Sequence, residues 1–241
     1  MKIPNKSIKK PLIIILLLLT LTFISVPSHA WLIYHKPEFK GKVIDSETKE
    51  PIEGAVVVVT YSKTVFRFMP ETGDVIIEVK ETLTDKDGNF SIPSYTTMID
   101  PLAWESHADF IIFKPGYGSF PDWRVSPPQM WLHNVPPGNS RYYDWNLSFE
   151  EFFSGKVGEV KELWASELMK EDVNPPQKIN LAMGIVELPK LKTREERIKA
   201  KPAPVGEPSD WKKQKQFIKA IREEWQYLTG EDPRDLYIYK K

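Results

Sequence analysis

Apolar residues recur at strand spacing between Trp31 and Phe149. Phe39 to Asp45 alternates loosely and predicts a first strand, after an apolar and aromatic lead-in at 31–39. The run Val56 to Tyr61 is β-branched and too apolar for an exposed edge, so it predicts a central strand buried on both faces. Gly54 and Ala55 are small at the point where the chain enters the sheet closely.

Turn signals divide the rest of this region into further strands. The segment 64–84 predicts a hairpin around the turn Pro70 to Asp74. Asp85 to Asn89 predicts a second tight turn, in which Gly88 adopts a positive φ. Phe90 to Ile92, Asp109 to Phe113 and Tyr142 to Phe149 predict the remaining strands.

After Phe149 the apolar spacing becomes helical. We expect a helix over 157–168, a short buried helix over 179–188, and a brief turn after the capping-box pair Thr193 and Glu196. A Pro-rich linker follows at 199–208, and then a helix from Trp211 to Thr229 that Ser209 or Asp210 begins and Gly230 ends. The sequence therefore predicts a mainly β plus α protein, with a β-domain at 31–149 and a helical extension at 150–241.

Residues 1–30 have the pattern of a secretory signal peptide. Four lysines precede the 15-residue apolar run Leu12 to Val26, and small residues stand at Ser28 and Ala30. Cleavage after Ala30 is the favoured interpretation because a bilayer-spanning helix needs about 20 apolar residues. The alternative is an uncleaved inner-membrane anchor at 12–26. The expected location is the periplasm, the cell envelope or the medium of a bacterium.

Charge and composition narrow the function classes. Without residues 1–30 the chain has 29 basic and 33 acidic residues, a net charge of −4, which gives no electrostatic basis for binding nucleic acid. The absence of cysteine excludes disulfides, Cys-ligated zinc and thiol catalysis.

Four motifs occur in a fixed order along the β-region: Gly41 to Asp45, Pro51 to Val58, Thr84 to Phe90, and Lys114 to Tyr117. Together they resemble the carboxypeptidase regulatory-like domain, a transthyretin-like (prealbumin-like) fold, over about residues 38–149. The resemblance implies a seven-stranded Greek-key β-sandwich. It also implies a module that is usually non-catalytic and that accompanies secreted enzymes, surface proteins and outer-membrane receptors. No family is identified for 150–241.

Two clusters invite a metal interpretation and fail it. Counted from Asp85, the glycine and the twelfth residue do not have the spacing of an EF-hand loop, so a β-turn explains that motif. His35 and Glu38 have the His-x-x-Glu spacing of metallocarboxypeptidases, but only His107 and His133 could complete a zinc site, and both are expected in loops. We expect no catalytic residue, no metal and no cofactor. A Lys42–Asn146 isopeptide bond is a remote alternative to two ordinary solvent-facing side chains.

Two regions are candidates for binding. The Pro-rich segment 118–141 carries Trp123, Trp131 and His133, which either bind a polysaccharide or small ligand or plug the end of the β-domain. On the last helix Phe217, Ile218, Ile221, Trp225 and Leu228 form an apolar stripe. The stripe packs either on the chain's own β-domain or on a partner protein or second copy; in the partner interpretation Phe217, Ile221 and Trp225 make the contacts. We expect a non-enzymatic structural or protein-interaction role.

Overall fold

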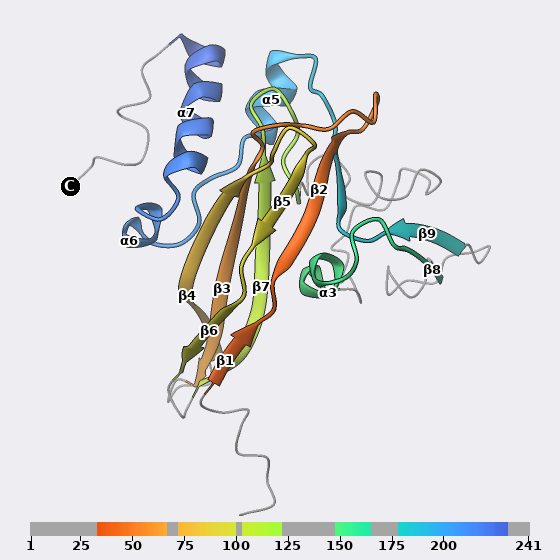
Figure 1. The fold of residues 1–241 in the computed structure, drawn as a ribbon. Helices are drawn as coiled ribbons and strands as arrows, with labels where there is room; N and C mark the ends of the chain where they lie inside the picture. The colour runs from red at the N-terminus through yellow and green to blue at the C-terminus, as the bar shows by residue number, and fades with distance from the viewer. Residues whose placement is uncertain (1–32, 67–71, 100–102, 122–147, 165–177, 231–241) are drawn as a thin grey trace, which may run out of the picture.

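The computed structural model describes residues 33–66, 72–99, 103–121, 148–164 and 178–230. Within them strands predominate and helices occur mainly in the last third, which confirms the β plus α class (Figure 1). In the described part of the chain, no helix is long and apolar enough to cross a membrane.

The strands form two layers around one core. The first layer is the sheet β10–β2–β5, continued beyond short breaks by the pair β1–β6, and the second layer is the sheet β4–β3–β7. All pairs are antiparallel except β10 with β2. The strands are β1 (Ile33–Lys36), β2 (Phe39–Asp45), β3 (Val56–Phe66), β4 (Thr72–Leu83), β5 (Asn89–Ile92), β6 (Tyr95–Met98), β7 (Ala103–Phe113) and β10 (Ile185–Leu188).

The strand β3 is apolar on both faces, as its valine run predicts. Val57 and Val59 point into the main core, where they meet residues of the first layer such as Phe39 and Ile92. Val56 and Val58 point to the other side and join a second buried cluster. This confirms the prediction that β3 is central and buried on both faces.

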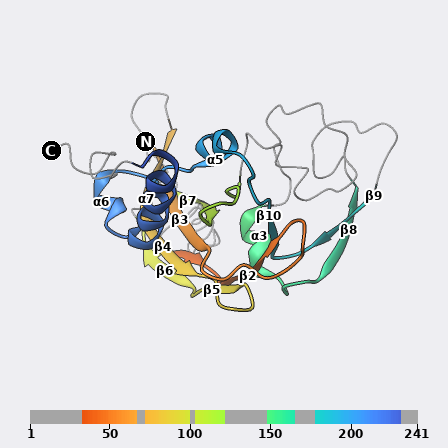
Figure 2. The same cartoon turned by 90° about the horizontal axis from the view of Figure 1, so that it is seen from above.

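The helix α7 (Lys215–Thr229) covers the second face of β3. Its side chains Phe217, Ala220 and Ile221 pack against Val56, Val58 and Val79 of the sheet, and Figure 2 shows α7 lying along that layer. Gly230 ends the helix in the left-handed conformation, as predicted, whereas its N-cap is Gln214 rather than Ser209 or Asp210. A separate short helix, α6 (Pro208–Trp211), precedes it.

The helix α3 (Phe149–Ser154) closes the edge of the main core between β2 and β7. Ser148 caps its first turn, and its Phe153 ring lies 4.4 Å from that of Phe110 and 5.5 Å from that of Phe90. Phe149 was predicted to end a strand and instead begins this helix; the rest of that predicted strand, 142–147, lies outside the described residues.

Two predicted helices of the C-terminal extension are strands. The segment 157–168 contains β8 (Val160–Trp164), and 179–188 contains most of β9 (Lys178–Ala182) together with β10. β8 pairs with β9, and β10 pairs in parallel with β2 because the backbone edge of β2 offers hydrogen bonds there. Gly41 makes this approach possible, since a Cβ on it would lie 2.5 Å from the Phe90 ring and 2.8 Å from the carbonyl oxygen of Gly184.

The helix α5 (Arg194–Ala200) begins with the predicted capping box of Thr193 and Glu196. The expectation of only a brief turn there is wrong, because seven residues are helical and the helix includes the first two residues of the predicted linker 199–208. From it Arg197 donates to both carboxylate oxygens of Glu224 on α7, at 2.7 and 2.6 Å. Glu224 is buried and also accepts a hydrogen bond from the backbone N–H of Gly116, in the turn after β7. One carboxylate therefore connects α5, α7 and the second layer.

Glu224→Gln is expected to lower the free energy of unfolding by about 2–3 kcal/mol, because it leaves the Arg197 guanidinium largely buried without its counter-charge. Urea denaturation followed by circular dichroism measures the change. Glu223→Ala is the matched control: its pair with Lys219 is exposed and 3.8 Å long, so the loss is expected to stay below about 0.5 kcal/mol. Equal losses in the two variants would contradict the role assigned to Glu224.

Candidate functional site

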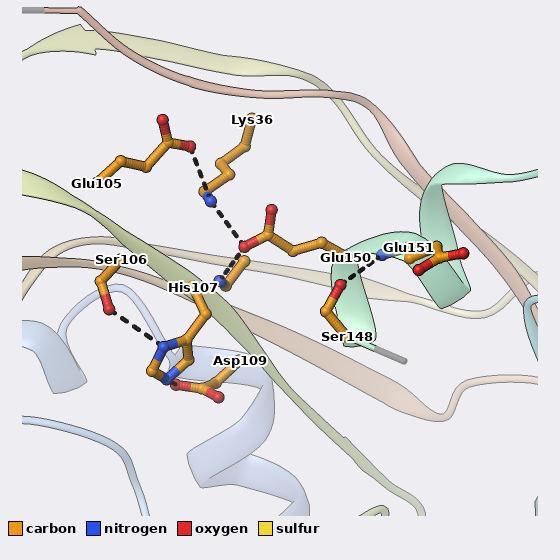
Figure 3. A network of polar contacts seen from close by, with 9 residues as sticks. Lys36, Glu105, Ser106, His107, Asp109, Ser148, Glu150 and Glu151 are labelled. Carbon is orange, nitrogen blue, oxygen red and sulfur yellow. Dashed lines mark hydrogen bonds and ion pairs between the residues drawn. The ribbon is translucent and has the colours of Figure 1, made fainter. Parts of the chain in front are cut away.

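A connected group of charged side chains lies where β1, β7 and α3 meet (Figure 3). The ammonium group of Lys36 on β1 is almost fully buried and lies 2.8 Å from the Glu105 carboxylate of β7 and 2.7 Å from the Glu150 carboxylate of α3. The same Glu150 oxygen accepts a hydrogen bond from the backbone N–H of Ala108 at 2.7 Å. Three elements are thereby joined through one cation.

Local sequence explains how each member reaches this point. Lys36 belongs to the inward-facing set of β1, together with Tyr34, because strand side chains alternate. Glu150 stands in the first turn of α3, where the positive end of the helix dipole favours a carboxylate. Glu105 lies next to an irregularity of β7 that changes the direction of the side chains after it.

That irregularity is a β-bulge. Tyr61 of β3 pairs with Ala108 and Lys63 pairs with Glu105, so Ser106 and His107 together oppose Ser62. The pairing of β3 with β4 also shifts between Tyr61 and Ser62. Both neighbours of β3 thus break register at the same level of the sheet.

The bulge brings Ser106, His107 and Asp109 together. The Ser106 Oγ lies 3.1 Å from His107 Nδ1, and His107 Nε2 lies 3.2 Å from Asp109 Oδ2 (Figure 3). If Nε2 carries the proton, Nδ1 is free to accept from the serine hydroxyl. The sequence analysis placed His107 in a loop, and that expectation is wrong because the residue lies within β7.

The three residue types are those of a hydrolase triad, but His107 faces the serine with Nδ1 and the aspartate with Nε2, the reverse of that triad, and the group is not shielded from water. The His107 and Asp109 side chains are each about half exposed. Water therefore competes for their hydrogen bonds, whereas hydrolases gain most from a dry, preorganised site. Burial raises the pKa of the Asp109 carboxyl, and the neighbouring His107 opposes this shift. The group is a half-exposed polar cluster at the bulge.

Two tyrosines on the core side of the Lys36 network have unsatisfied hydroxyl groups. The hydroxyls of Tyr34 and Tyr61 are buried and have no hydrogen-bond partner among the residues that the structure describes, although the ring centroids lie 6.4 Å apart, edge to face. Burial raises the pKa of both phenols above 10, and the negative charge of Glu150 adds to the effect in each. Both groups therefore stay protonated and neutral, and neither is a base.

The predicted metal motifs do not assemble into metal sites. His35 Nδ1 lies 2.7 Å from the Thr96 hydroxyl, whereas Glu38 pairs with Lys40 and Ser91. Asp85 accepts hydrogen bonds from the backbone of Asp87 and Asn89, and Gly88 has a φ of 77°, which confirms the β-turn. Within the described ranges no group of three or more His, Asp or Glu side chains could hold a metal ion.

The predicted binding residues divide into two sets. Trp123, Trp131 and His133 lie outside the described residues, as does Asn146 of the imagined isopeptide bond. Phe217 and Ile221 are buried against the chain's own sheet, so they are not free to contact a partner. Trp225 is partly buried beneath the Lys201 ammonium group, which lies 4.4 Å from its ring centroid.

Sequence reasoning missed the Lys36 network and the serine–histidine–aspartate cluster. The sequence contains the motif Ser-His-x-Asp, but no sequence signal predicts the bulge that brings the three side chains together. Comparison with protein-family models, with curated proteins and with solved structures finds no match for this chain.

The double substitution Tyr34→Phe and Tyr61→Phe is expected to reduce alkaline destabilisation. Because the folded-state pKa of each phenol is raised above its ordinary value of 10.0, the folded protein keeps protons that the unfolded chain releases. The corresponding stability is present below about pH 10 and is lost as the pH rises further. The double variant has neither phenol, so it does not lose stability in this way above about pH 10.

Urea denaturation at pH 7 and at pH 11 tests this expectation. At pH 7 the variant should differ from the wild type by less than about 1 kcal/mol, since the deleted hydroxyls make no hydrogen bond. At pH 11 it should be the more stable protein. A parallel loss of stability in both proteins would refute the assignment.

Proposed function

We propose that this chain is a non-catalytic, exported bacterial envelope protein in which a carboxypeptidase regulatory-like sandwich supports a protein-interaction surface. The places of the four ordered motifs support the family assignment. Gly41–Asp45 lies in β2, the valines of the second motif lie in β3, and the third and fourth motifs form turns after β4 and β7. Two strand layers with a shared core are what a Greek-key sandwich requires.

The observation that carries the interaction role is the ribbon formed by β8 and β9. In the described part of the chain these two strands pair only with each other, and Figure 1 shows them projecting from the side of the strand layers. A two-stranded ribbon is at best marginally stable in water by itself. It gains stability by burying a face.

One face of the ribbon is already used. Leu163 and Leu181 pack against the main core and hold the ribbon to the rest of the protein. Val160, Glu162 and Trp164 alternate with them and are exposed. The inner face therefore holds the ribbon to the core, and the outer face is the exposed one in the described part of the chain.

The outer face has the composition of a recognition surface. Val160 pairs with Ala182, and Trp164 pairs with Lys178, whose ammonium lies 5.2 Å from the indole centroid. Lys178 also forms an ion pair with Glu162. An exposed Trp beside a paired charge fits a binding centre, since aromatic residues are enriched in interface cores. This surface takes the place of the buried α7 stripe as the partner contact.

Site-specific photo-crosslinking in cells tests the proposal. A photoreactive residue at Glu162 is expected to give a defined adduct with another protein or with a second copy of this chain. The double variant Val160→Ser, Trp164→Ser should lose most of that adduct with only a small change in its urea midpoint, because both side chains are exposed on the outer face of the ribbon. A photoreactive residue at Ile198, which is also exposed but lies on α5, is the matched control.

An equal yield of the same adduct from positions 162 and 198 would contradict a specific surface on the ribbon. Retention of the adduct in the serine variant would contradict the role of the two apolar side chains.

A further inference from the structure

Three exposed apolar side chains lie at the end of the molecule where the described chain begins. Ile33 of β1, Met98 of β6 and Trp104 of β7 are 49%, 77% and 45% exposed. Ile33 pairs directly with Met98, and Figure 1 shows the starts of β1 and β7 and the end of β6 at the same lower end. We call these three residues the foot.

The foot carries apolar groups on both outer surfaces of the molecule. Tyr34 and Ala103 point into the core, so Ile33 and Trp104, their neighbours in the strands, point outward from opposite layers. Glu105, which follows Trp104 in β7, is paired with Lys36. Asp74 of β4, which lies level with Trp104 across β3, accepts a hydrogen bond from the Thr64 hydroxyl. An end that is apolar on both sides fits insertion into an interface better than side-on contact with a flat protein surface.

The apolar run near the N-terminus lies close in sequence to the foot. The apolar run Leu12 to Val26 ends seven residues before Ile33. Seven residues reach at most about 25 Å even when fully extended. The strand β3, with 11 residues, spans about 36 Å, so the opposite end of the layers lies farther from that run than the foot does.

The shortness of the run 12–26 favours cleavage, but the apolar foot close to its end leads us to infer the alternative: the run is retained as a membrane anchor and the foot rests in the lipid interface beside it. The inference rests on the proposed export, since export places residues 31–241 on the outer side of the inner membrane. Four lysines before the run and none within it give the orientation in which the N-terminus stays in the cytoplasm. Trp104 then takes the position that tryptophan favours at a membrane surface.

This orientation gives the anchor and the ribbon separate roles. The foot fixes one end of the strand layers at the lipid, and β8–β9 projects sideways from them (Figure 1). The partner-binding face is thereby held close to the membrane rather than released into the medium.

A lipid-quenching experiment on the full chain tests the inference. Because the chain has no cysteine, a single introduced cysteine is the only thiol that can be labelled. Met98→Cys is labelled with a fluorophore, and the protein is reconstituted into phosphatidylethanolamine–phosphatidylglycerol vesicles that contain nitroxide-headgroup lipid. The label at position 98 is expected to be quenched several-fold more than a label introduced by Lys86→Cys. Lys86 is the matched control because it is exposed in the turn between β4 and β5, at the other end of the layers.

When Ile33→Glu is combined with the labelled Met98→Cys, quenching of the label should fall, since a carboxylate at the foot opposes burial in the interface. Equal quenching at positions 98 and 86 would overturn the inference. So would an intact mass, measured on protein from the exporting host, that begins at Trp31. Either result leaves the interaction proposal standing, because that proposal depends on the crosslink at position 162.

Discussion

The two-sided burial of β3 is the constraint on which the rest of the structure depends. A strand with valine at four successive positions cannot leave either face in water, since each exposed valine forgoes roughly 1.5–3 kcal/mol of burial. One face is covered by the first strand layer and the other by α7. The C-terminal helix is therefore part of the folded unit, although more than 100 residues separate Val58 from Phe217.

The connection through Glu224 follows from this constraint. A helix lying on a sheet through a small apolar patch can slide, because hydrophobic contact is not directional. The Arg197–Glu224 pair and the hydrogen bond to Gly116 are directional, and they fix α7 relative to both α5 and the turn after β7. Glu81 of β4 adds a second point by accepting from the first backbone N–H groups of α7. Apolar burial supplies the attraction, and the charged hydrogen bonds define the position.

Much of the strand pattern could be predicted from the sequence because period and turn chemistry agree there. The run 56–61, the turn at Asp85 and the Thr193 capping box are local signals, and each is confirmed. The segment 179–188 was misread as a helix because a short apolar run fits either structure, and its strand β10 is decided by the distant edge of β2. The polar network shows the same limit: Lys36, Glu105 and Glu150 lie far apart in sequence and meet only because α3 closes the core. Contacts that depend on a bulge or on the edge of a distant strand have no local sequence pattern from which they could be predicted.

The way the interior is filled indicates where specificity can arise. Aromatic rings occupy the space between the layers and beside α3, and the charged group nearest to them is internally paired. A side chain committed to such packing cannot change without a cost in stability, so it has little freedom to follow a ligand. The exposed side chains of the foot and of the outer face of the ribbon do not belong to this packing, yet Ile33, Met98, Trp104, Val160 and Trp164 are apolar where a polar residue would suit water better. The apolar groups at these two separate edges are therefore the side chains on which the proposed contacts with a partner and with lipid depend.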